Sequence, residues 1–94
     1  MNKISVFFSK DAKRDLQKIP SHIVIKLRNW VELVIHEGIL SARKIPGFHD
    51  EPLKGNRLGQ RSIRLNKAYR AIYIEKNIGE MEIIEILEVN KHDY

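Results

Sequence analysis

Residues 61–90 read RSIRLNKAYRAIYIEKNIGEMEIIEILEVN, and this segment predicts most of a β-sheet. Runs rich in isoleucine, tyrosine and valine are separated by two short polar breaks, which is the pattern of strands joined by tight turns. The last run is apolar on both faces apart from its glutamates, which is typical of a strand inside a sheet. The pattern predicts strands over residues 61–65, 69–75 and 81–90, with turns at 66–68 and 77–79.

A fourth strand is predicted near the N-terminus, over residues 3–8. Ile4, Val6 and Phe8 alternate there with Lys3, Ser5 and Phe7. Ser9 can then cap a short helix over residues 10–19, because its hydroxyl can accept a hydrogen bond from a free backbone N–H of the first turn.

A longer helix is predicted from Ser21, as its N-cap, to about Glu37. Pro20 separates the two helices, and Gly38 stands where a glycine ends a helix. Apolar residues recur at three- and four-residue steps and predict one buried stripe. The stripe contains Val24, Leu27, Trp30 or Val31, Val34 and Ile35.

These elements predict an α+β fold in the order β-α-α-β-β-β. The first strand must pair beside the C-terminal strands, with the α-helical hairpin packed on one face of the sheet. At 94 residues the chain has the length of a single domain, 1–94. Residues 39–60 contain several glycines and prolines and predict a long irregular loop, a kind of segment that is often functional.

Composition excludes several classes of protein. Hydrophobic residues make up 43% and charged residues 31%, which excludes a disordered chain. Without a run of 18 apolar residues, no transmembrane helix is predicted. The first apolar stretch, residues 4–8, is too short for a signal peptide, so we expect a cytoplasmic protein. Cysteine is absent, which excludes disulfides and thiolate metal sites.

Positive charge is concentrated in residues 54–70. This window has six basic residues and no acidic one, whereas the chain as a whole has a net charge of +5. Such a window is typical of a protein that binds a polyanion such as nucleic acid. An acidic protein partner, or a solvated face that balances the glutamates of residues 75–88, would give the same pattern.

No familiar metal or cofactor motif is present. The four histidines, His22, His36, His49 and His92, are far apart in sequence, and the glycines match neither a P-loop nor a dinucleotide fingerprint. We therefore predict no metal and no cofactor.

The chain does contain the groups that metal-free RNA cleavage requires. Attack of a 2′-hydroxyl on its phosphate needs a base for the hydroxyl proton, cations around the phosphate and an acid for the departing 5′-oxygen. Glu51, several Arg and Lys residues and the terminal His92 and Tyr94 supply these groups. Aromatic side chains can also stack on an unpaired base.

The order of these residues resembles the RelE/ParE superfamily of toxins from toxin–antitoxin pairs, with the YoeB and HigB branches as the nearest likeness. The likeness covers residues 50–94 and is carried by four segments. They are EPLKG at 51–55, GQRSIR at 59–64, YRAIY at 69–73 and KHDY at 91–94. The resemblance implies a curved antiparallel sheet with helices on one side, and a ribosome-dependent endoribonuclease that cuts mRNA.

The resemblance also implies roles for individual residues. Glu51 matches the general base, Lys54 a phosphate ligand and Arg64 the cation that stabilises the transition state. His92 and Tyr94 match the terminal acid and the stacking or orienting group. Chains of the HigB type carry histidine at the position of Glu51, so His49 and Lys54 remain alternative bases. The cations expected to contact RNA are Lys54, Arg57, Arg61, Arg70 and Lys91.

Two departures from the family pattern and two alternative functions remain. Asp93 separates His92 from Tyr94, and Arg61 replaces an aromatic residue that is common before the serine. The expected partners are mRNA, the ribosome and a cognate antitoxin. The alternative is a non-catalytic toxin of the ParE type, which binds DNA gyrase. The His/Tyr ending favours the nuclease, and a basic adaptor without toxicity is a third reading.

Overall fold

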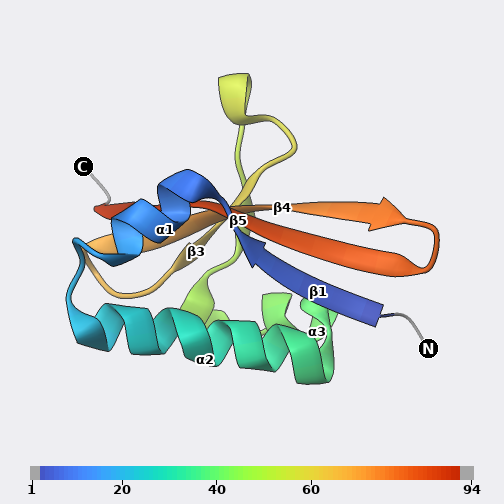
Figure 1. The fold of residues 1–94 in the computed structure, drawn as a ribbon, viewed down its shortest axis with the longest axis horizontal. Coiled ribbons are helices and arrows are strands. Elements are labelled where there is room, and N and C mark those ends of the chain that lie inside the picture. The colour runs from blue at the N-terminus through green and yellow to red at the C-terminus, as the bar shows by residue number, and fades with distance from the viewer. Residues whose placement is uncertain (1–2, 92–94) are drawn as a thin grey trace.

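The computed structural model describes residues 3–91 and has the predicted α+β class (Figure 1). All the predicted helices and strands are present, together with short elements in the long loop. In chain order the elements are β1 (Lys3–Phe8), α1 (Lys10–Leu16), α2 (Ser21–Glu37), α3 (Ile39–Arg43), the 3-10 helix η1 (Pro46–Phe48), β2 (Glu51–Pro52), the 3-10 helix η2 (Gly55–Arg57), β3 (Arg61–Arg64), β4 (Tyr69–Ile78) and β5 (Met81–Lys91).

The five strands form one sheet in the order β1-β5-β4-β3-β2. The pairs β5–β4, β4–β3 and β3–β2 are antiparallel, whereas β1 runs parallel to β5. The sheet is therefore mixed, and the expectation of an antiparallel sheet is wrong for the β1–β5 pair. β5 has a partner on both sides, as its nearly continuous apolar sequence predicted.

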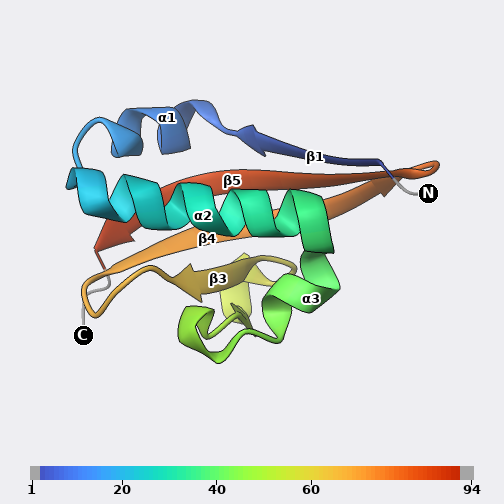
Figure 2. The ribbon, with the colours of Figure 1, turned by 90° about the horizontal axis from the view of Figure 1, so that it is seen from below.

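Helix α1 continues the line of β1 along β5 (Figure 2). The Ser9 hydroxyl accepts a hydrogen bond from the Ala12 N–H at 3.0 Å, which confirms it as the N-cap, and donates to the Leu87 carbonyl at 2.7 Å. The Asp15 carboxylate accepts from the Val89 N–H at 2.9 Å. α1 therefore covers the β5 edge beyond the end of β1 and pairs backbone groups that an edge would leave free.

Helix α2 lies along one face of the sheet and supplies the centre of the core (Figure 2). Its buried side chains recur at helical spacing: Ile23, Leu27, Trp30 and Val34. The Trp30 ring packs on the Tyr73 ring of β4, with centroids 5.0 Å apart. The predicted stripe was wrong at Ile35, which is 44% exposed, while Ile23 is 1% exposed.

Two helix ends also differ from the prediction. α1 ends at Leu16 rather than Ile19. Pro20, not Ser21, holds the N-cap position of α2, and no side chain caps that helix. The fixed φ of proline suits the entry to a helix without such a cap.

The segment predicted as irregular, residues 39–60, contains α3, η1, β2 and η2. β2 has only two residues, and it adds to the sheet edge by pairing Glu51 with Ser62 and Pro52 with Arg61. Figure 1 shows the chain that follows β2 projecting away from the sheet as a loop before it returns to β3. None of the helices in residues 3–91 combines the length and apolar character needed to cross a bilayer.

Candidate functional site

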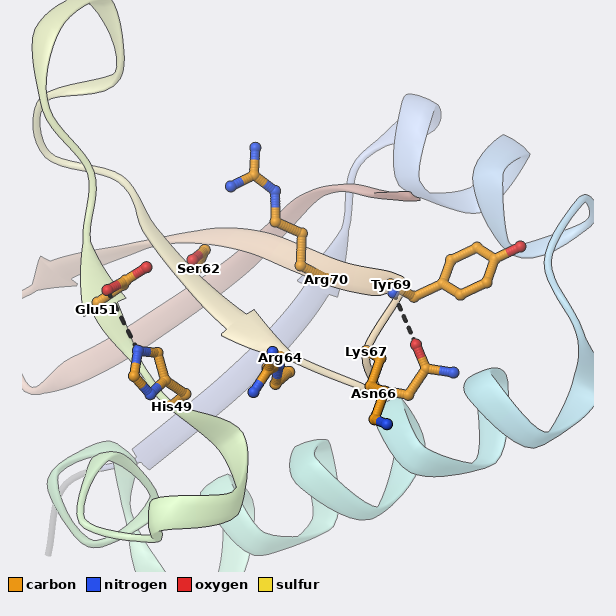
Figure 3. A pocket seen from close by; sticks show the side chains of 8 residues that line it. All are labelled: His49, Glu51, Ser62, Arg64, Asn66, Lys67, Tyr69 and Arg70. Atoms are coloured by element: carbon orange, nitrogen blue, oxygen red, sulfur yellow. Dashed lines mark hydrogen bonds and ion pairs between the residues drawn. The ribbon is translucent and has the colours of Figure 1, made fainter. Parts of the chain in front are cut away.

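A cavity of about 310 Å³ lies over β3 and the start of β4 (Figure 3). Two of its walls come from the segment before β3 and from the β3–β4 turn. Eight residues line it: His49, Glu51, Ser62, Arg64, Asn66, Lys67, Tyr69 and Arg70. Glu51, Arg64 and Arg70, all proposed from the sequence, therefore meet at one place.

Strand register explains why two arginines share the cavity. Ser62 and Arg64 occupy alternate positions of β3 and face the same side of the sheet. Arg64 stands directly opposite Arg70 in the β3–β4 pair. Like charges opposite one another destabilise a sheet, whereas an anion between them would relieve the repulsion. The arrangement is suited to binding a phosphate group.

The surroundings of the two arginines strengthen this interpretation. Arg64 is exposed and has no carboxylate within salt-bridge distance among residues 3–91. The Nε atom of Arg70 is buried, and it has no hydrogen-bond partner in the described part of the chain. Arg64 therefore retains its donors for a ligand, and no carboxylate of residues 3–91 forms a salt bridge with Arg70.

An acid–base pair lies at one side of the cavity. The His49 Nε2 and Glu51 Oε2 atoms are 3.6 Å apart, and Figure 3 shows the two side chains pointing toward one another. Both side chains are more than half exposed, so a substrate can reach them. A carboxylate beside an imidazole is a common arrangement for accepting a proton, since either group can orient the other.

The side chain of Asp50, the residue between His49 and Glu51, does not line the cavity. Its buried carboxylate accepts hydrogen bonds from the Arg61 Nε at 2.6 Å and the Tyr73 hydroxyl at 2.5 Å. Arg43 also donates to the Tyr73 oxygen, at 3.3 Å, and pairs with Glu75 at 2.8 Å. Burial and the hydrogen bond to Asp50 raise the pKa of Tyr73, so the phenol stays a donor.

Four of the five predicted RNA-contacting cations, Lys54, Arg57, Arg61 and Lys91, lie outside the cavity lining. Arg61 is paired with Asp50, and Arg57 is paired with Glu88 at 2.9 Å. Lys54 is exposed at the start of the projecting loop. The structure thus places Lys54 and Arg57 apart from Arg64, although all three belong to the basic window of residues 54–70.

The C-terminal candidates are placed only in part. His92 and Tyr94 lie outside the described residues. Lys91 ends β5 and pairs in register with Tyr69, a residue of the cavity wall. The described chain therefore ends beside the strand position that carries Tyr69.

Sequence reasoning did not assign roles to four residues of the cavity wall. Tyr69 was part of a quoted segment, but it was not proposed as a base-stacking group. Ser62 could have been found from its alternation with Arg64, since both face one side of β3. Asn66 and Lys67 belong to the predicted turn, and the Asn66 side chain accepts hydrogen bonds from the N–H groups of Ala68 and Tyr69. Within residues 3–91, no three side chains of the metal-ligating kinds converge.

Proteins similar to this chain are found among solved structures. No protein-family model matches the sequence, and no curated protein matches it significantly. Among solved structures, the Mycobacterium tuberculosis toxin–antitoxin complex RelBE2 is 27% identical and has a TM-score of 0.61, with 94% of this chain and 96% of that chain covered. The YoeB/ParE toxin from Agrobacterium tumefaciens is 20% identical with a TM-score of 0.69, covering 95% and 99%.

A third similar structure is the DinJ–YafQ toxin–antitoxin complex from E. coli, at 17% identity and a TM-score of 0.72, with 96% of this chain and 93% of that chain covered. In all three cases the match extends over nearly the full length of both chains, so it includes most of residues 3–49, where the sequence resemblance was limited to the expected layout. The resemblance drawn from residues 50–94 is thereby confirmed at the level of the fold. This chain has the fold of the RelE/ParE superfamily of toxins.

Proposed function

We propose that this protein is the toxin of a toxin–antitoxin pair and a ribosome-dependent endoribonuclease that cleaves mRNA. The observation that carries the proposal is the cavity, whose lining brings the His49–Glu51 pair together with Arg64 and Arg70, two arginines at opposite positions of the β3–β4 pair. This arrangement contains a proton acceptor and a phosphate site within one hollow. The toxin structures that share this fold support the same class of function.

In the proposed reaction, the His49–Glu51 pair takes the proton of an RNA 2′-hydroxyl. The resulting oxygen attacks the neighbouring phosphorus, and the bond from phosphorus to the 5′-oxygen breaks. The products are a 2′,3′-cyclic phosphate and a 5′-hydroxyl, whose proton comes from His92. Arg64 and Arg70 stabilise the negative charge that develops on the phosphate oxygens, and no metal takes part. Tyr69 and Tyr94 stack on unpaired bases.

Of the three alternative bases, the geometry favours His49 and Glu51 over Lys54. Lys54 does not line the cavity, whereas the other two do and contact each other. Lys54, Arg57 and Lys91 are then outer contacts to RNA or to the ribosome. Arg61, held by a buried carboxylate, has a structural role instead.

The decisive experiment measures single-turnover cleavage of mRNA bound to purified ribosomes. Arg64→Ala is expected to slow cleavage by about 10²–10³, because it removes a charge that stabilises the transition state. Glu51→Gln and His92→Gln should each cost about 10²–10⁴ as proton-transfer groups. Lys76→Ala, on the far part of β4, serves as the control and should cleave at the parent rate.

Induced expression separates this function from the alternatives. Growth arrest with loss of protein synthesis supports the nuclease, arrest with altered DNA supercoiling would instead indicate a gyrase-binding toxin, and no arrest would indicate an adaptor. Parent-rate cleavage by both Arg64→Ala and His92→Gln would contradict the proposed active site.

A cognate antitoxin is the expected protein partner. Two of the similar solved structures, RelBE2 and DinJ–YafQ, are toxin–antitoxin complexes. Co-expression with the protein encoded by the neighbouring gene should restore growth and give a stable complex on size-exclusion chromatography.

A further inference from the structure

Asp50 lies between the two members of the acid–base pair, yet its side chain is fully buried. His49 and Glu51 both line the cavity, whereas the carboxylate of Asp50 is directed away from it, toward Arg61 and Tyr73. There it accepts two hydrogen bonds, from the Arg61 Nε at 2.6 Å and from the Tyr73 hydroxyl at 2.5 Å.

The donors to Asp50 belong to rigid parts of the molecule. Arg61 and Tyr73 are directly opposite one another in the β3–β4 pair. The Tyr73 ring is completely buried and packs on Trp30 of α2. Short hydrogen bonds to an ionised carboxylate are stronger than those between neutral groups, so Asp50 fixes the segment before β2 to the centre of the sheet.

His49 is held from its other neighbour as well. Phe48 is 7% exposed, belongs to the core, and has the Lys26 ammonium 4.8 Å from its ring centroid. Between these two anchors His49 adopts φ 45° and ψ 52°, and it is the only non-glycine with positive φ among residues 3–91. Such a left-handed conformation persists only where the surroundings impose it.

We infer that Asp50 is a positioning residue, which holds His49 and Glu51 together at the cavity and sets the geometry of proton abstraction. The inference rests on the proposed nuclease function and deepens it. Asp50 itself does not line the cavity, and its side chain is fully buried. Its effect on catalysis must therefore pass through the two residues beside it.

The test compares variants in the single-turnover assay with ribosome-bound mRNA. Asp50→Ala should reduce the maximal rate by about tenfold to a hundredfold and leave the concentration for half-maximal rate within about threefold, since the phosphate cations are unchanged. Asp50→Asn keeps an acceptor oxygen and should recover part of the rate. Tyr73→Phe, which removes one donor but keeps the ring, should give a smaller loss and provides a second variant if Asp50→Ala does not fold.

A matched control distinguishes positioning from general loss of stability. Asp15 is a second carboxylate that anchors one element to another, through the Val89 N–H, but it connects α1 to β5. Asp15→Ala should lower the melting temperature yet cleave within about twofold of the parent rate, when both are assayed well below melting.

A double-mutant cycle completes the test. If Asp50 acts through its neighbours, Asp50→Ala should slow the already slow variant with Glu51→Gln and His49→Gln by less than about threefold. A full additional loss in that background would overturn the inference, as would an Asp50→Ala variant that cleaves at the parent rate. A parent protein that fails to cleave ribosome-bound mRNA would instead overturn the proposed function itself.

Discussion

At the scale of single residues, the two opposed arginines connect stability to function. Arg64 and Arg70 occupy directly opposite positions of β3 and β4, and two like charges at such positions oppose folding. The exposed Arg64 has no acidic partner in the described chain to offset the repulsion. Sites of this kind are typical of binding residues that reduce stability for the sake of activity.

We therefore expect Arg64→Ala to stabilise the protein while it slows cleavage. The free energy of unfolding should rise by about 0.2–1 kcal/mol, the range for an unfavourable cross-strand pair. Urea unfolding followed by circular dichroism measures this change. Arg14→Ala is the control, because that exposed arginine faces Asp11 at 3.6 Å and its removal should give no gain. A loss of stability in Arg64→Ala would contradict the repulsion.

Tyr73 gives a second prediction at this scale, on pH. Its pKa is raised in the folded state by burial and by the hydrogen bond to Asp50, whereas in the unfolded chain it is about 10. The resulting stability is complete below about pH 10 and is lost as the pH rises above that value. Urea unfolding between pH 8 and 11 should show a steeper decline for the parent than for Tyr73→Phe, by up to about 1.4 kcal/mol per pH unit. If the free energy of unfolding falls equally with pH in the parent and in Tyr73→Phe, the raised pKa of Tyr73 is contradicted.

At the scale of helices and strands, the sequence predicted the elements in which apolar residues recur at a regular spacing. The strand at residues 3–8 has the predicted limits, and the Asn66 side chain closes the predicted turn through the N–H groups of Ala68 and Tyr69. The short elements within residues 39–60 could not be predicted, because the apolar residues of this segment do not recur at a regular spacing. Long-range contacts hold them instead, such as Arg43 with Glu75 and Asp50 with Arg61.

The same distinction applies to the site. Arg64 and Arg70 were named from the sequence, since they belong to recognisable strands and family segments. Their meeting depends on the length of the turn between them, which fixes the register. The role of Asp50 depends on a contact with Tyr73, 23 residues away, and no local pattern indicates it.

Two isoleucines of helix α2 test which face of the helix is buried. Ile23 is 1% exposed and Ile35 is 44% exposed. Ile23→Ala should lower the free energy of unfolding by about 2–4 kcal/mol, because it leaves a cavity against the sheet. Ile35→Ala should change it by less than about 1 kcal/mol. Thermal or urea unfolding of the two variants decides the matter, and equal losses would mean that the helix is rotated from the orientation described.

At the scale of the whole molecule, five of the six cations of residues 54–70 divide into two groups. Arg57 and Arg61 are neutralised by Glu88 and Asp50. Arg64, Lys67 and Arg70 line the cavity, where no acid other than Glu51 is found. The fold thus converts a uniformly basic stretch into a local concentration of positive charge beside an acid–base pair. Net charge alone could not locate that concentration.

This division predicts how salt affects RNA binding. Each phosphate contact to single-stranded RNA contributes about 0.7 to the slope of log affinity against log salt concentration. The three cavity cations alone should contribute about −2 to the slope, and Arg64→Ala should make the slope less steep by about 0.7. Lys76→Ala should leave it unchanged, because Lys76 lies outside the cavity and has Glu85 within 3.8 Å. Fluorescence anisotropy with an RNA blocked at the attacking 2′-hydroxyl measures the slope. A flat salt dependence would show that the cavity does not bind phosphate, and an equal change in both variants would place the contact outside it.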